Sequence, residues 1–155
     1  MFNTCIKRRI SMKSDQNIKK AVQEHLEYTD EEMKMFLADS NNGDILSKMS
    51  TLADKTIVVE VVSSKGCNSA HRTGDRFYFD AAGNLITSLN PKRMCIYALH
   101  SLAPLIYGAS EFLYADMDPN TLKFSRAGCI DVGVKCGGWG HIIMELRVED
   151  RNRGK

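Results

Sequence analysis

The chain has 155 residues, 43% of them hydrophobic and 26% charged, which suits one globular domain with its own core and excludes extended disorder. A formal net charge of +2 is too small to predict a nucleic-acid partner, since nucleic-acid binders usually carry a basic stripe. Five cysteines without a preceding apolar leader predict a reducing, cytoplasmic location, with thiols or metal ligands in place of disulfides.

The first 53 residues are predicted to form a helical N-terminal arm, and translation is expected to start at either Met1 or Met12. A first helix begins near Ser14 or Asp15. Thr29 and Glu32 have the spacing of a capping box and predict the start of a second helix. Residues 41–43 are expected to end it, and a third short helix follows over residues 45–52. The arm is amphipathic, with apolar positions at Ile18, Val22, Leu26, Met33, Phe36 and Leu37.

From residue 54 the pattern changes to strands, and we predict an α+β core domain over residues 54–150 with a short tail over 151–155. Residues 56–62 are β-branched and are followed by a second strand over 76–79. A turn around Gly83 leads into a short apolar stretch over 85–87. Residues 130–135 and 142–149 alternate apolar with polar side chains, which indicates a closing hairpin with one buried face.

Two helices are predicted between these strands, one ending near residue 102 and the next covering 103–114. Pro104 separates them, because proline lacks the amide hydrogen that a helix interior needs. The apolar stretch 94–115 is long enough to cross a bilayer, but Glu111 within it argues against a membrane span. The predicted fold is an antiparallel sheet of four or five strands, packed by a central helix pair.

The thiols and imidazoles of the core are the candidate metal ligands. Zinc prefers four such ligands in a tetrahedral array. Paired short hooks are missing, so the spacing leaves structural burial, metal binding and a reactive thiol all open. The set that we name for a zinc or iron ion is Cys67, His71, Cys95 and Cys129.

Three residues near the predicted hairpin are the candidate catalytic groups, namely Cys129, Asp131 and His141. Burial of Asp131 would raise its pKa and suit it to acid or base catalysis, whereas the alternation favours a place on the solvent face. Between the two strands, residues 136–140 are glycine-rich and form a plausible turn. Trp139 in that turn is either a surface residue or a lid over a pocket.

The order of several short motifs resembles a family of small, uncharacterised bacterial proteins over about residues 55–148. The motifs are a Gly-Asp-x-Phe strand entry at Gly74, a cysteine at a helix start at Cys95, and a late Cys-x-Asp at Cys129. The resemblance implies an α+β fold and recurring cysteines at Cys67, Cys95 and Cys129. It implies no reaction, and residues 136–141 look like an addition to the family pattern.

These features predict a small cytoplasmic protein with a cysteine-lined pocket, acting as an enzyme or enzyme subunit on a small-molecule ligand. The alternative is a non-catalytic module that oligomerises or binds a partner and whose cysteines belong to the core. In both cases the amphipathic arm predicts a homo-oligomer, because its apolar residues need a surface to bury. Neither nucleic acid nor a membrane is an expected partner.

Overall fold

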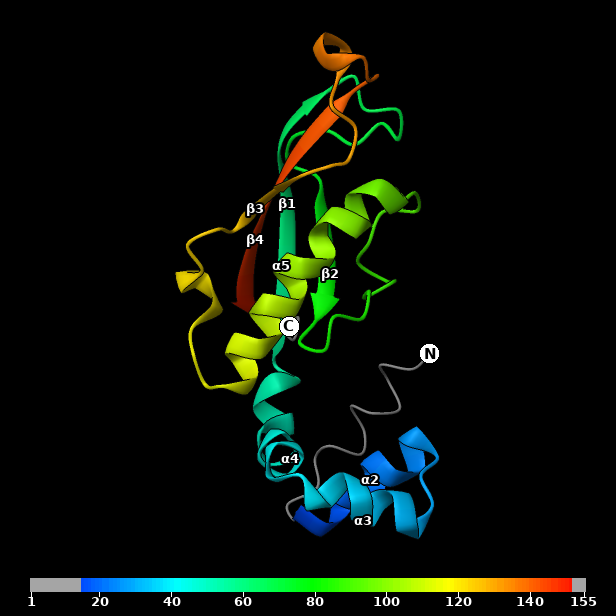
Figure 1. Ribbon diagram of the computed structural model, residues 1–155, viewed down its shortest axis with the longest axis vertical. Coiled ribbons are helices and arrows are strands. Elements are labelled where there is room, and N and C mark those ends of the chain that lie inside the picture. Colours follow the sequence, from blue (N-terminus) through cyan, green and yellow to red (C-terminus); the bar gives the residue numbers. More distant parts are fainter. Residues whose placement is uncertain (1–14, 152–155) are drawn as a thin grey trace. The chain divides into compact units, whose positions relative to one another are not determined.

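The computed structural model describes residues 15–151, and the chain divides into two compact units, Met1–Leu52 and Ala53–Lys155 (Figure 1). The expectations for Met1, Met12 and Cys5, and most of the predicted tail, lie outside the described residues. The first unit contains α2 (Asp15–Leu26), α3 (Asp30–Ala38) and α4 (Ser40–Leu52). The second contains the sheet and the long helix α5 (Ile96–Tyr114), which confirms the α+β class.

The start of α3 confirms the predicted capping box. The Glu32 amide donates to the Thr29 hydroxyl at 3.2 Å, and the Thr29 amide donates to the Glu32 carboxylate at 2.8 Å. The predicted end of this helix at residues 41–43 is wrong, because those residues belong to the first turns of α4. The Asp39 carboxylate accepts the Asn41 amide at 2.9 Å, so an acidic side chain starts a new helix where the glycine was expected to stop one.

Four antiparallel strands form one sheet in the order β2-β1-β4-β3. The strands are β1 (Lys55–Lys65), β2 (Arg76–Asp80), β3 (Arg126–Gly128) and β4 (His141–Asp150). The longest pairing joins β1 to β4, from Lys55 opposite Asp150 to Lys65 opposite His141. The apolar stretch over residues 85–87 forms no strand and makes a single bridge, between Phe79 and Leu85.

One face of the sheet is covered by α5 (Figure 1). In β4 alternate residues point toward this helix and are buried, whereas β1 is buried on both faces over residues 56–59. The helix contributes apolar residues at helical spacing. The core of this unit includes Ile57, Val59, Val61, Phe77, Phe79, Ile142, Met144, Leu146, Ala98, Leu102 and Ala109.

The predicted central helix pair is instead the single helix α5, with Pro104 inside it. Proline at this position removes one hydrogen bond, which would run from residue 104 to the carbonyl of His100. Pro104 is exposed, so water can satisfy that carbonyl. The buried residues Leu102 and Ile106 flank the proline and keep both halves of the helix on the sheet. Within residues 15–151, no helix combines the length and the apolar character that a membrane crossing requires.

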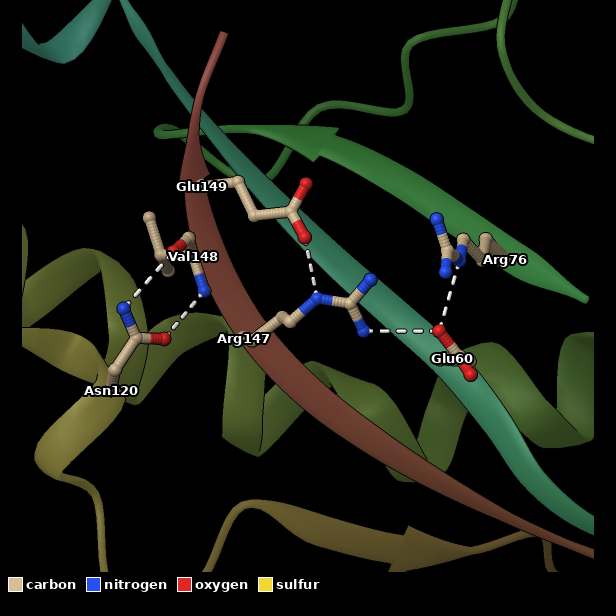
Figure 2. A network of polar contacts seen from close by, with 6 residues as sticks. All are labelled: Glu60, Arg76, Asn120, Arg147, Val148 and Glu149. Carbon is tan, nitrogen blue, oxygen red and sulfur yellow. Dashed lines mark hydrogen bonds and ion pairs between the residues drawn. The ribbon is translucent and has the colours of Figure 1, made fainter. Parts of the chain in front are cut away.

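The other face of the sheet carries charged side chains that neutralise one another (Figure 2). Glu60 on β1 accepts hydrogen bonds from Arg76 at 2.9 Å and from Arg147 at 3.1 Å, which ties three strands together. The Arg147 and Arg76 guanidinium groups hold the pKa of Glu60 below its usual value. Ion pairs this exposed add little stability. Their effect is to pair charges from neighbouring strands on this face.

Asparagine side chains close both edges of the sheet. Asn120 donates to the Val148 carbonyl at 3.0 Å and accepts the Val148 amide at 2.8 Å, beyond the end of β3 (Figure 2). On the opposite edge, Asn90 makes the same pair of bonds with the backbone of Tyr78, at 2.7 and 2.9 Å. Each asparagine side chain thus makes the hydrogen bonds that a neighbouring strand would make. It protects an edge of the sheet that could otherwise pair with a strand of another chain.

Candidate functional site

A cavity of about 610 Å³ lies in the second unit, at the end of the sheet where β4 begins. The loops after β1 and β3, the start of α5 and the loop before β4 all contribute to its wall. The wall includes Cys67, Cys95 and Cys129 together with Asp131, Trp139 and His141. The structure therefore brings together the three cysteines and all three candidate catalytic residues of the sequence analysis.

Cys67 follows β1 directly and opens a tight turn, in which the Ala70 amide donates to the Cys67 carbonyl at 2.9 Å. This turn packs against the start of β4. A Cβ atom added at Gly140 would overlap the Gly66 carbonyl, so only glycine allows these two backbones to approach so closely. Ala70 closes the turn with a φ of 60°, in the left-handed region that costs a non-glycine residue about 1–2 kcal/mol.

Cys95 is the N-cap residue of α5. Its sulfur makes no capping hydrogen bond, so the first-turn amides act on it through the partial positive charge of the helix N-terminus. Burial opposes ionisation of this thiol, but the Ala98 amide and the Ser69 hydroxyl bring its pKa below the ordinary value. The Tyr97 amide adds to the same effect. These neighbours favour the thiolate, the reactive form of cysteine.

Cys129 and His141 are tied to each other by the last bonds between β3 and β4. The Cys129 amide donates to the Ile142 carbonyl at 3.0 Å, and the Ile142 amide donates to the Cys129 sulfur at 3.4 Å. His141 Nδ1 lies 3.7 Å from that sulfur and 2.5 Å from the Asp131 carbonyl oxygen. Because a carbonyl only accepts, this contact assigns a proton to Nδ1 and leaves Nε2 as the acceptor of a neutral ring.

Asp131 organises the loop in front of β4. Its carboxylate accepts the backbone amides of Gly133 at 2.9 Å, Trp139 at 3.1 Å and Gly140 at 3.1 Å. The bonds from Gly133 and Gly140 hold the pKa of Asp131 below its usual value. The amide hydrogen bonds outweigh the opposing effect of burial on this pKa, and the carboxylate is occupied by amides, so an acid–base role for Asp131 loses its basis.

The same bonds explain why the predicted strand over residues 130–135 is wrong. This segment is a loop, and its apolar alternation leaves side chains in solvent instead of on a sheet face. Ile130, Val132 and Val134 are 52%, 60% and 69% exposed. The loop closes with the short helix η2 (Val134–Cys136), and it wraps around the carboxylate of Asp131.

Replacing Asp131 with asparagine is expected to loosen this loop. In the folded protein the Asp131 pKa is lowered, so its contribution to stability is present above the unfolded pKa of about 3.9 and is lost as the pH falls through the folded pKa. We therefore expect Asp131→Asn to be less stable than the native chain at pH 7, with a difference that shrinks toward pH 3. Faster tryptic cleavage after the exposed Lys135 would report the loosening. Glu31→Gln, at an exposed helical site, is the control; an equal cleavage rate in both variants would contradict the role of Asp131.

His71 does not line the cavity. Its side chain is buried, with its ring edge-on to Phe77 at a centroid distance of 5.0 Å, and its Nε2 has no hydrogen-bond partner among the described residues. Within residues 15–151, no group of three or more His, Cys, Asp or Glu side chains is placed to hold a metal ion. The described side chains thus do not fit the zinc or iron set of Cys67, His71, Cys95 and Cys129, and we derive no chemistry from a metal.

Two features of the wall were missed by the sequence analysis. Ser69, whose hydroxyl lowers the pKa of Cys95, lies two residues after Cys67, and only that proximity could have drawn attention to it. The other missed feature is the pair Ile96 and Tyr97, which are 67% and 60% exposed. They form an apolar rim with Trp139, the residue named above as a surface residue or a lid, which lines the cavity and is 77% exposed.

Comparison of the chain with family models, curated proteins and solved structures found no match. The resemblance to small bacterial proteins stays a prediction. Any function must therefore be argued from the geometry of the cavity.

Proposed function

We propose that the chain is a thiol-dependent enzyme, or a subunit of one, in which Cys95 is the nucleophile for a small-molecule substrate bound in the cavity. The observation that carries this proposal is the meeting of three cysteines, distant in the sequence, in the wall of one cavity. Structural cysteines usually lie dispersed in a core as small apolar residues. All three of these are instead partly exposed.

The neighbours of Cys95 give it the features of an activated nucleophile. It stands at a helix N-terminus, and the nearby Ala98 amide and Ser69 hydroxyl lower its pKa, which is the setting in which thiolates are stabilised. His141 lines the same cavity, and its Nε2 is the group best suited to take up or return a proton. Asp131 acts only through the loop that it holds, and is a positioning residue. A reducing cytoplasmic setting would keep these thiols free.

Alkylation by iodoacetamide, mapped to each cysteine by mass spectrometry across pH 5 to 10, tests this proposal. We expect the Cys95 rate to rise at a lower pH than the value of about 8.5 for free cysteine. Ser69→Ala removes one of the groups that lower the pKa of Cys95, so the alkylation rate of Cys95 at pH 7 should fall severalfold, on the order of two- to tenfold. Ser63→Ala, an exposed serine on the same strand-and-loop segment, is the matched control. A Cys95 profile like that of free cysteine, unmoved by Ser69→Ala, would contradict the proposal.

The second candidate is a non-catalytic module that oligomerises or binds a partner. It is favoured by the apolar rim, because exposed aromatic residues gathered at one place are typical of interfaces. In that case the three cavity thiols should resist iodoacetamide in the folded protein. Light scattering of the full chain, with and without Trp139→Ser, tests whether the predicted homo-oligomer exists and whether it uses this rim.

A further inference from the structure

A second thiol of the same cavity is placed beside Cys95. Ser69 lies in the turn that begins at Cys67 and lines the same cavity as Cys95, and its hydroxyl lowers the pKa of the Cys95 thiol. In a tight turn the first and fourth Cα atoms lie within about 7 Å of each other, so Cys67 cannot lie far from Ser69. Cys67 and Cys95 both line the cavity. The turn therefore places Cys67 in the wall of the cavity that the N-terminus of α5 also lines.

The remaining contacts indicate which of the two other cavity cysteines, Cys67 or Cys129, is the better partner for Cys95. The Cys129 sulfur accepts the Ile142 amide and lies close to His141 Nδ1, so the sheet holds it in place. The Cys67 sulfur has no hydrogen-bond partner among the described residues. Since no described residue bonds the Cys67 sulfur, its side chain can turn toward a neighbouring sulfur of the cavity.

We propose that Cys67 is the resolving thiol of a thiol–disulfide exchange initiated by Cys95, and that the substrates of the cavity are low-molecular-mass disulfides. This inference rests on the proposed function and adds its substrate class. It needs no metal or cofactor, because both electrons that reduce the substrate come from the two thiols.

The exchange proceeds in two balanced steps. The Cys95 thiolate attacks one sulfur of the substrate R–S–S–R, forming a Cys95–S–S–R mixed disulfide and releasing one R–S⁻. Cys67 then attacks the Cys95 sulfur, which forms the Cys67–Cys95 disulfide and releases the second R–S⁻; the proton lost by Cys67 neutralises one leaving thiolate. A reducing thiol then restores the pair: two R′–SH molecules reduce the internal disulfide and leave as R′–S–S–R′.

The aromatic disulfide 5,5′-dithiobis(2-nitrobenzoate) is a suitable probe, because each thiolate that it releases absorbs visible light. We would use the full chain with Cys5→Ser and Cys136→Ser, so that only the three cavity thiols remain. With Cys67 and Cys95 both present, we expect an internal disulfide between these two residues, mapped by mass spectrometry, and no lasting adduct on Cys95. Adding Cys67→Ser should trap the adduct on Cys95 and remove one released thiolate per chain. Cys67→Ala gives a second test should the serine variant fold poorly.

The outcomes separate the two proposals. A lasting Cys95 adduct in the presence of Cys67, or an internal disulfide between Cys95 and Cys129, overturns the resolving role of Cys67 but leaves Cys95 as the nucleophile. If Cys95 forms no adduct even in the Cys67→Ser chain, both the exchange and the proposed function are wrong. An internal disulfide that disappears when either Cys67 or Cys95 is replaced, but persists in Cys129→Ser, supports the assignment.

Discussion

Replacing Phe77 with alanine is expected to lower the free energy of unfolding of the second unit by about 3–5 kcal/mol. Phe77 is completely buried on β2, between the sheet and its covering helix. Its loss removes apolar contacts and leaves a cavity that the surrounding strands can only partly fill. It also removes the ring against which His71 packs, so the loop that carries Cys67 should become more mobile. Urea denaturation measures the first effect, and the alkylation rate of Cys67 measures the second.

Phe124→Ala is the matched control for this substitution. Phe124 is 78% exposed, and its one notable ring contact is the Lys123 ammonium at 5.9 Å. Replacing it should lower the free energy of unfolding by less than about 1 kcal/mol. Equal losses for the two phenylalanines would mean that Phe77 is not in the core.

Gly140→Ala is expected to lower the free energy of unfolding of the second unit by about 3 kcal/mol, at the upper end of the effects seen when a packed site is overfilled. The added Cβ would overlap the Gly66 carbonyl and crowd the Cys67 amide. Both obstacles are backbone atoms, so no flexible side chain can give way. The turn that carries Cys67 must move off the start of β4, and the cavity should change shape with it. Urea denaturation and the map of disulfides formed with the aromatic probe would record the two consequences.

Gly108→Ala tests whether the cost comes from the contact or from the loss of a glycine. Gly108 lies within α5, and a Cβ there would meet no atom within 4 Å. Alanine in place of glycine at an open helical site should raise the free energy of unfolding by about 0.5–1 kcal/mol. Opposite signs for the two substitutions are therefore expected, and a neutral Gly140→Ala would contradict the close approach of the two backbones.

The parts of the fold that were predictable from the sequence are those that local patterns determine. The Thr29 capping box, the β-branched run of β1 and the alternation of β4 each encode their own structure over a few residues. Pro104 misled the prediction because a local rule was overridden by packing. The sheet holds the apolar stripe of α5 on both sides of the proline, and an exposed carbonyl can bind water.

The site was less predictable because its geometry depends on contacts that are distant in the sequence. The candidate cysteines could be named from their types alone, but nothing in their spacing revealed that Cys67, Cys95 and Cys129 share one cavity. Asp131 is the clearest case. Its bonds to the amides of Trp139 and Gly140 turn an apparent strand into a loop, and they change a candidate acid into a structural carboxylate. Alternation of residue types carries no signal for such bonds.

The pairing of β1 with β4 has a consequence for how the protein is made. These two strands lie in the middle of the sheet, yet they are its first and last strands along the chain, with Lys55 opposite Asp150. During translation, β1 and β2 can meet early, but the apolar face of β1 lacks its longest partner until β4 has left the ribosome. Contacts this distant in sequence form late and leave unpaired strands open to aggregation meanwhile. A stop codon within the codons of β4 would therefore open the sheet at its centre and not trim its edge.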